Sequence, residues 1–121
     1  QRSAELLKRM IELYKGDLME GGDSGDVIFH ERERLKTIFI ESCQKLSGIY
    51  TEQAELQQAE EILRRAFTAE PCDEAICLKL LELYMAQGRK SKAVKLYYSF
   101  KKRLEQELDV KIDKKLTEAI R

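Results

Sequence analysis

The sequence is poor in the residues that usually build catalytic and metal sites. Its 121 residues include one His, one Pro, six Gly, three Cys and no Trp. No Ser lies in a nucleophile turn, and the glycines of Gly21-Gly22-Asp23-Ser24-Gly25 lack the following Lys and Ser or Thr of a phosphate-binding loop. We therefore expect that the chain is not an enzyme and that it needs no cofactor.

Charge of one sign and long apolar runs are also missing. Lys and Arg number 22, as do Asp and Glu, so the formal net charge is zero and no net field favours nucleic acid or an anionic membrane. No apolar run approaches the roughly 20 residues that a membrane-spanning helix needs, and no signal peptide is visible. Because the chain lacks an initiator Met and enters a helical pattern at once, we expect a piece of a longer protein.

The three cysteines, Cys43, Cys72 and Cys77, are an odd number in a chain without a secretory signal. This pattern favours reduced thiols and a cytoplasmic protein. A zinc site would need four ligands, and His30, the only histidine, lies far from the cysteines in the sequence. We therefore expect no metal and interpret the cysteines as packing residues, since buried Cys behaves as a small hydrophobe.

What the sequence does contain is a repeat with a period of 34 residues. Matching residues recur at this spacing in six pairs: Cys43 and Cys77, Leu46 and Leu80, Tyr50 and Tyr84, Ala59 and Ala93, Leu63 and Tyr97, and Ala66 and Phe100. The period, with small residues where two helices must approach closely, is typical of the tetratricopeptide repeat, a helix–turn–helix unit. It predicts an all-α chain with a right-handed stack of two hairpins, preceded by one short helix and closed by another. Such repeats present surfaces that hold other macromolecules.

Apolar periodicity and turn residues set the expected ends of the helices. A first helix is predicted over 3–14 and ended by Gly16, and a loop follows to residue 25. The second helix is predicted over 26–52 and the third over 54–69. The predicted N-caps of the second, fourth, fifth and last helices are Asp26, Asp73, Ser91 and Asp113. Gly88 is the predicted end of the fourth helix, and the last helix should cover an apolar edge with Leu116 and Ile120.

The charged and aromatic side chains indicate solvated faces and core positions. Glu60 with Arg64, and Glu61 with Arg65, have the spacing of ion pairs along a helix. The tyrosines on apolar faces are Tyr14, Tyr50, Tyr84 and Tyr97. The densest basic run, 101–103, is preceded by basic residues between 89 and 95, but acidic residues follow it and no aromatic is left to stack on bases. We favour a solvated helix face there over a nucleic-acid site.

The order of these segments resembles a known family. A short helix ends in Tyr14-Lys15-Gly16-Asp17-Leu18, the long helix is entered through Glu31-Arg32-Glu33-Arg34-Leu35, and two tetratricopeptide units follow. The chain closes with Lys102-Arg103-Leu104-Glu105-Gln106-Glu107-Leu108-Asp109-Val110 and a capped last helix. Over nearly its whole length the chain resembles the bacterial transcriptional activator domain of Streptomyces-type antibiotic regulatory proteins and related response regulators.

The resemblance implies a role in transcription. At four positions this sequence differs from the residues that are usual in the family. The family often has Trp at Val27, Pro at His30, Gly at Asp109 and Pro at Ile112, which concerns local loop geometry more than the fold. In the family a winged-helix DNA-binding domain precedes this domain, sometimes with a receiver domain ahead of it. The resemblance therefore implies one domain over 1–121 that contacts DNA only through an upstream domain. Its own partners would be protein: the DNA-binding domain, a second copy or the transcription machinery, with effector sensing as another role.

The repeat register also predicts a binding surface. If the first helix of each hairpin lines a concave groove, the groove residues are Glu41, Gln44, Lys45, Ala75, Leu78, Lys79 and Glu82. Leu78 would be the apolar centre of a helix-in-groove contact, or it would pack within the domain. A general tetratricopeptide scaffold outside transcription is the alternative function. A co-chaperone clamp for peptide C-termini does not fit, because the groove lysines face Glu41 and Glu82 and form no unopposed carboxylate trap.

Overall fold

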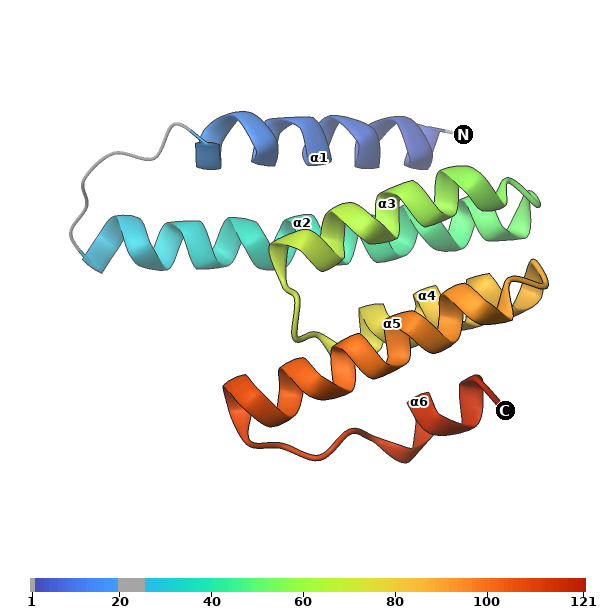
Figure 1. Cartoon of the computed structure of the whole chain (residues 1–121). Helices are drawn as coiled ribbons and strands as arrows, with labels where there is room; N and C mark the ends of the chain where they lie inside the picture. The colour runs from blue at the N-terminus through green and yellow to red at the C-terminus, as the bar shows by residue number, and fades with distance from the viewer. Residues whose placement is uncertain (1, 20–25) are drawn as a thin grey trace. The chain divides into compact units, whose positions relative to one another are not determined.

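A computed structural model describes residues 2–19 and 26–121, and all regular secondary structure in these residues is helical (Figure 1). The helices are α1 (Arg2–Met19), α2 (Asp26–Glu52), α3 (Leu56–Ala69), α4 (Glu74–Ala86), α5 (Lys90–Arg103), the π-helical turn η1 (Leu104–Leu108) and α6 (Lys114–Ala119). They form two compact units, Gln1–Ala69 and Glu70–Arg121. The all-α, tetratricopeptide-like prediction is confirmed.

In the first unit, α1 and α3 both pack against the long helix α2 (Figure 1). The apolar positions of α2 recur every three or four residues, so they share one face of the helix. Each of the three helices contributes to one core, whose members are Ile11, Phe39, Cys43, Leu46, Tyr50, Ala59, Leu63 and Ala66. Arg65 on α3 also reaches Glu12 on α1, with 3.4 Å between Nη1 and Oε1.

The prediction for the end of α1 is wrong. Gly16 was expected to end the helix, but the helix continues to Met19. A glycine inside a helix costs about 1 kcal/mol relative to alanine, and it ends a helix only when it takes the left-handed conformation. The predicted loop is shortened accordingly, and its remaining residues, 20–25, lie outside the described part of the chain.

Residues 27–34, the first two turns of α2, extend beyond the repeat, and the sequence predicts that they meet α1. The contacts seen between the two helices lie further along α2, where Ser42 Oγ approaches Met10 Sδ at 3.8 Å and the Lys8 ammonium lies 5.8 Å from the centre of the Tyr50 ring. The side chains of residues 26–29 lie outside the described ones, as does that of Tyr14. The expectation is therefore open for those positions.

In the second unit, α4 and α5 form a hairpin, and α6 packs against α4. Leu116 of α6 is 2% exposed, and the Tyr97 hydroxyl of α5 lies 2.8 Å from Thr117 Oγ1 of α6. The last helix thus covers an apolar edge of this unit, as the sequence predicts. It also supplies the polar partner that the buried tyrosine hydroxyl needs.

Three of the predicted helix ends in this unit are confirmed. The Asp73 carboxylate accepts a hydrogen bond from the backbone N–H of Ile76, and the Asp113 carboxylate accepts one from Lys115. Gly88 has φ +72° just after α4, which is the left-handed conformation that favours glycine. Ser91 is not a cap, because α5 begins one residue earlier, at Lys90, with Arg89 at the N-cap position.

The 34-residue register identifies the core correctly. All twelve paired residues are buried, from Cys43 and Cys77 at 0% exposed to Tyr50 at 8%. Ala59 and Ala93 are both 0% exposed, as expected where two helices of a hairpin approach closely. The repeat therefore predicts which residue faces each core, although the two units fill equivalent positions with side chains of different size.

The chain leaves α5 through a widened turn. The backbone N–H of Asp109 bonds to the carbonyl of Leu104, which closes η1, and Asp109 then takes a left-handed conformation with φ +52°. The family often has glycine at this position, and Asp is among the few other residues that tolerate this conformation.

Candidate interaction surface

The outward face of α4 carries four of the seven predicted groove residues. Helical spacing places Ala75, Leu78, Lys79 and Glu82 on one side. Ala75, Lys79 and Glu82 are exposed, and Leu78 is half-buried. The opposite side of α4 is buried over a wide arc that includes Ile76, Cys77, Leu80, Leu81, Leu83 and Tyr84. The α4 face is therefore a narrow strip of three exposed side chains with the half-buried Leu78 at its edge.

The outward face of α2 carries the other three predicted residues. Glu41 and Lys45 are exposed, Gln44 is half-buried, and all three lie opposite the buried stripe of α2. Gly48 lies on the same face, and a Cβ atom added there would meet nothing within 4 Å. Because the predicted groove would take residues from both units, it stays a prediction.

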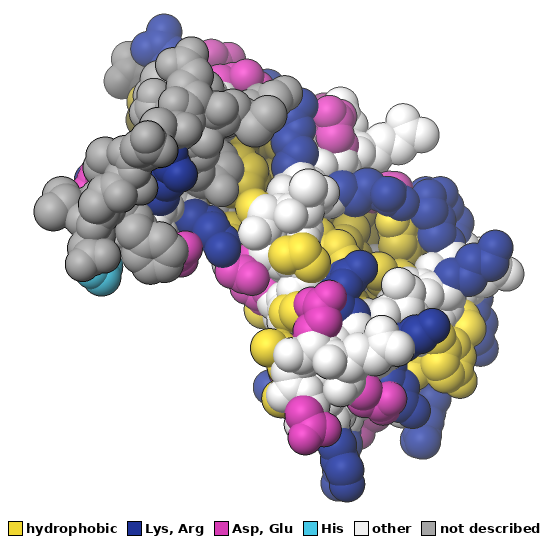
Figure 2. Space-filling view, turned by 60° about the vertical axis from the view of Figure 1, so that its left-hand side comes forward, with side chains coloured by type: hydrophobic (Ala, Val, Ile, Leu, Met, Phe, Trp, Pro, Cys, Tyr) yellow, Lys and Arg dark blue, Asp and Glu magenta, His cyan; other side chains and the backbone are white. Residues whose placement is uncertain are grey.

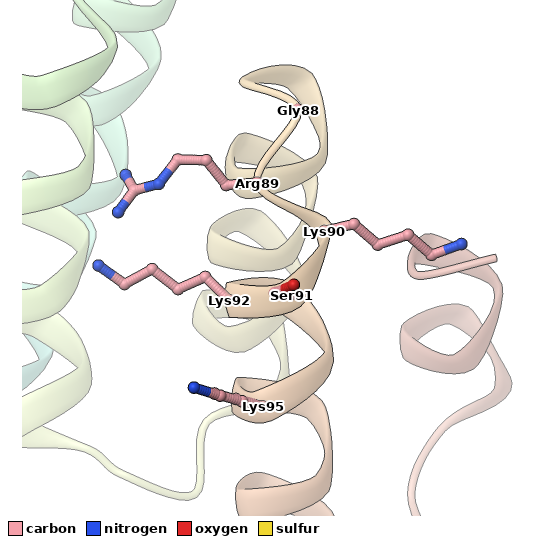
Figure 3. A pocket seen from close by; sticks show the side chains of 6 residues that line it. All are labelled: Gly88, Arg89, Lys90, Ser91, Lys92 and Lys95. Atoms are coloured by element: carbon pink, nitrogen blue, oxygen red, sulfur yellow. The ribbon is translucent and has the colours of Figure 1, made fainter.

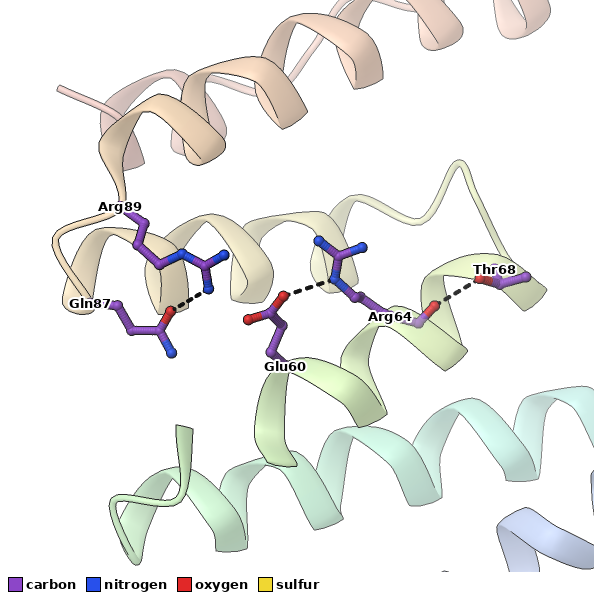
Figure 4. Close-up of polar contacts among 5 residues, drawn as sticks. All are labelled: Glu60, Arg64, Thr68, Gln87 and Arg89. Carbon is purple, nitrogen blue, oxygen red and sulfur yellow. Dashed lines mark hydrogen bonds and ion pairs between the residues drawn. The ribbon is translucent and has the colours of Figure 1, made fainter. Parts of the chain in front are cut away.

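The two ion pairs that the sequence predicts along α3 are present. Glu60 and Arg64 on α3 are joined at 2.9 Å, and Thr68 donates a hydrogen bond to the carbonyl of Arg64 (Figure 4). Glu61 and Arg65 approach to 3.3 Å, so both predicted pairs are present. The Glu60 side chain is only 13% exposed, so the expectation of a solvated face does not hold for it, whereas the more exposed Glu61–Arg65 pair contributes about 0.3–0.5 kcal/mol. Figure 2 shows acidic and basic side chains interspersed over the face in view.

The cysteines differ in their surroundings. Burial raises the pKa of the Cys43 and Cys77 thiols to about 12, so both are neutral near pH 7. Cys72 is half-buried, and its sulfur lies 3.7 Å from Glu107 Oε2. Within residues 2–19 and 26–121 no group of three or more His, Cys, Asp or Glu could hold a metal ion. Cys43 and Cys77 are core residues, as the sequence predicts.

Helix α5 is the most basic element of the chain. Its 14 residues include six Lys and Arg and no Asp or Glu. At its start, residues 88–92 and Lys95 line an open depression of about 530 Å³ (Figure 3). Arg89 and Lys92 each lie 5.3 Å from the ring centre of Tyr84, where the negative face of the ring attracts a cation.

One aromatic side chain of α5 is exposed against expectation. Tyr98 is 59% exposed on the outward side of α5, so the expectation that no aromatic remains accessible is wrong. Its neighbour Tyr97 is 5% exposed, and the two rings meet edge to face with centres 5.0 Å apart. The helical period could have predicted this difference in exposure. Tyr97 lies on the same face as the buried Ala93 and Phe100, and Tyr98 does not.

In the part of the chain that the structure describes, no helix has the length and apolar character to cross a membrane. Comparison with curated proteins and with solved structures gave no match. The family profile of the bacterial transcriptional activator domain matches residues 1–121, the full length of the sequence. This is the family that the segment order resembles, and the helical hairpins agree with it. The chain therefore belongs to the bacterial transcriptional activator domain family.

Proposed function

We propose that the chain is the regulatory, protein-binding module of a bacterial transcription regulator whose DNA-binding domain lies upstream of residue 1. The single observation that carries this proposal is the family match over residues 1–121. Two helical hairpins with separate cores add physical support, since repeats of this kind offer long exposed helix faces to partners. In this view, the module acts by contact with the DNA-binding domain, a second copy or the transcription machinery.

We place the working surface on the α4 face, and the α2 face is a separate candidate. The α4 face combines an apolar side chain, Leu78, with a cation and an anion, Lys79 and Glu82. An apolar contact rimmed by opposite charges suits a partner helix that inserts one apolar residue and pairs its own charges at the rim. Alternation of charge sign argues against a partner recognised by net charge alone.

The test is a promoter reporter built on the full-length regulator that contains this chain. We expect Leu78→Asp to abolish activation, because a carboxylate would lose its water in the apolar contact that Leu78 makes with the partner. The matched control is Leu108→Asp, the same change at a residue that is 52% exposed on η1, outside the α4 face. Its activation should remain near that of the natural chain.

A charge exchange distinguishes a loss of partner binding from a loss of folding. Lys79→Glu with Glu82→Lys leaves the net charge unchanged and alters only exposed side chains, so the melting temperature should stay within about 2 °C. Activation should nevertheless fall severalfold if the α4 face binds a partner. Unchanged activation in the charge exchange, with a large loss of melting temperature in Leu78→Asp, would make Leu78 a core residue and exclude this surface.

The same reporter distinguishes the proposed function from the alternative function. A general protein-binding scaffold outside transcription would lose binding to its partner in Leu78→Asp, but promoter output would not change. A regulator module predicts loss of output even when the protein level and the melting temperature are normal.

A further inference from the structure

The outward face of α5 carries a stripe of exposed residues that share one chemistry. Ser91, Lys95, Tyr98 and Lys102 follow one another at intervals of three or four residues, so they lie in line along the helix. All four are exposed. They extend over about 16 Å, at 1.5 Å per residue. We refer to these four residues as the α5 stripe.

Charge makes the α5 stripe unusual within a neutral chain. Residues 70–121 contain twelve Lys and Arg and nine Asp and Glu, and α5 holds six of these twelve cations without any anion. Ion pairs of the kind seen on α3, where Glu60 neutralises Arg64, cannot form within α5. Lys90 extends from another side of the same helix, which adds positive potential around the stripe (Figure 3).

The residue types of the α5 stripe favour the DNA backbone over a protein partner. Lys, Ser and Tyr side chains are among the groups that contact phosphate oxygens, and the stripe contains nothing else. Protein interfaces are instead depleted in Lys and Ser, and their anchors are large apolar or Arg side chains. Tyr98 alone would suit such an anchor, and it stands between two lysines.

We propose that the α5 stripe binds the phosphate backbone of duplex DNA, without sequence preference. Lys95 and Lys102 supply the two charges, and the hydroxyls of Tyr98 and Ser91 donate hydrogen bonds to phosphate oxygens. The contact is weak by itself, and it would orient the module along DNA that the rest of the regulator holds. It is independent of the α4 face proposed above, so either surface can fail without the other.

The test is fluorescence anisotropy of a labelled 20-base-pair duplex titrated with the chain of residues 1–121 from about 20 to 150 mM salt. Two phosphates neutralised by Lys95 and Lys102 predict a slope of about −1.8 in log K against log salt, so affinity should fall about 40-fold over this range. A duplex of scrambled sequence should bind within about twofold of the first.

Matched variants locate the contact. Lys95→Glu with Lys102→Glu should weaken binding at least tenfold at 20 mM salt. Lys111→Glu with Lys114→Glu makes the same change of net charge at exposed positions outside α5, and it should weaken binding by less than about threefold. Tyr98→Phe should weaken DNA binding about two- to fivefold and should change no other measured property. Circular dichroism and melting temperature should match the natural chain in every variant, because the altered side chains are exposed.

Three results would overturn the proposal. Equal losses in the two charge variants would show attraction by net charge rather than by the stripe. If the folded chain did not bind the duplex at 20 mM salt, the α5 stripe would not be a DNA-binding surface. An acidic peptide of matched charge that binds more tightly than DNA, through the same lysines, would assign the stripe to a protein partner instead.

Discussion

The two buried thiols predict a specific loss of stability at alkaline pH. Cys43 and Cys77 are both 0% exposed, and burial raises the pKa of each from 9.0 to about 12. In the unfolded chain the thiols ionise near pH 9, whereas in the folded chain they keep their protons. The unfolded state therefore binds fewer protons above pH 9, and the free energy of unfolding falls as pH rises from about 9 to 12.

The size of this loss follows from the proton difference. At pH 10 each unfolded thiol is about nine-tenths ionised, which lowers the free energy of unfolding by about 1.4 kcal/mol per cysteine relative to pH 8. Both thiols together give roughly 3 kcal/mol. This is a large share of the 5–15 kcal/mol that holds a typical domain folded, and it is therefore measurable.

Urea denaturation at pH 8 and pH 10 measures the effect, with Cys43→Ala/Cys77→Ala as the reference. The double variant retains every Lys and Tyr that also titrates in this range, so the difference in pH dependence isolates the two thiols. We expect the natural chain to lose about 3 kcal/mol more than the variant. Equal losses in the two proteins would contradict the reasoning, as would rapid reaction of Cys43 and Cys77 with a thiol reagent in the folded state.

Three further predictions concern stability and use urea or thermal denaturation. Ala93→Leu should lower the free energy of unfolding by about 1–3 kcal/mol, since Ala93 is 0% exposed and a larger side chain must displace the facing helix; an unchanged midpoint would show that the hairpin has spare room. Gly48→Ala should raise it by about 0.5–1 kcal/mol, because the added Cβ meets no atom within 4 Å and alanine favours the helix. Asp73→Ala should lower it by about 1 kcal/mol through loss of the hydrogen bond to the Ile76 N–H, while Asp73→Asn should retain most of the stability.

Sequence reasoning predicted the core better than the helix ends. A residue such as Leu80 is placed by periodicity and repeat register together, and both depend on burial, which the folded chain must satisfy. The end of a helix depends on small local differences. Gly16 is tolerated inside α1, and the start of α5 at Lys90 makes no use of the Ser91 side chain that was expected to cap it.

The candidate surfaces were predictable only in part. Side-chain direction on α2 and α4 follows from helical spacing, so the predicted residues of each helix do lie on one face. The α5 stripe was missed because its lysines were counted with the acidic residues that follow in sequence, such as Glu105. Those acidic residues begin only at η1, where the widened turn ends the regular spacing of α5.

The repeat register also has a consequence for exchanging parts between the hairpins. Ala66 and Phe100 occupy equivalent places and are both buried, and so are Leu63 and Tyr97, whose hydroxyl reaches Thr117 on α6. The second hairpin therefore accommodates two aromatic rings where the first holds a methyl group and a leucine. Equivalent positions of the two hairpins thus hold side chains of different size, and a chimera with two copies of one hairpin would need its neighbouring helices replaced as well.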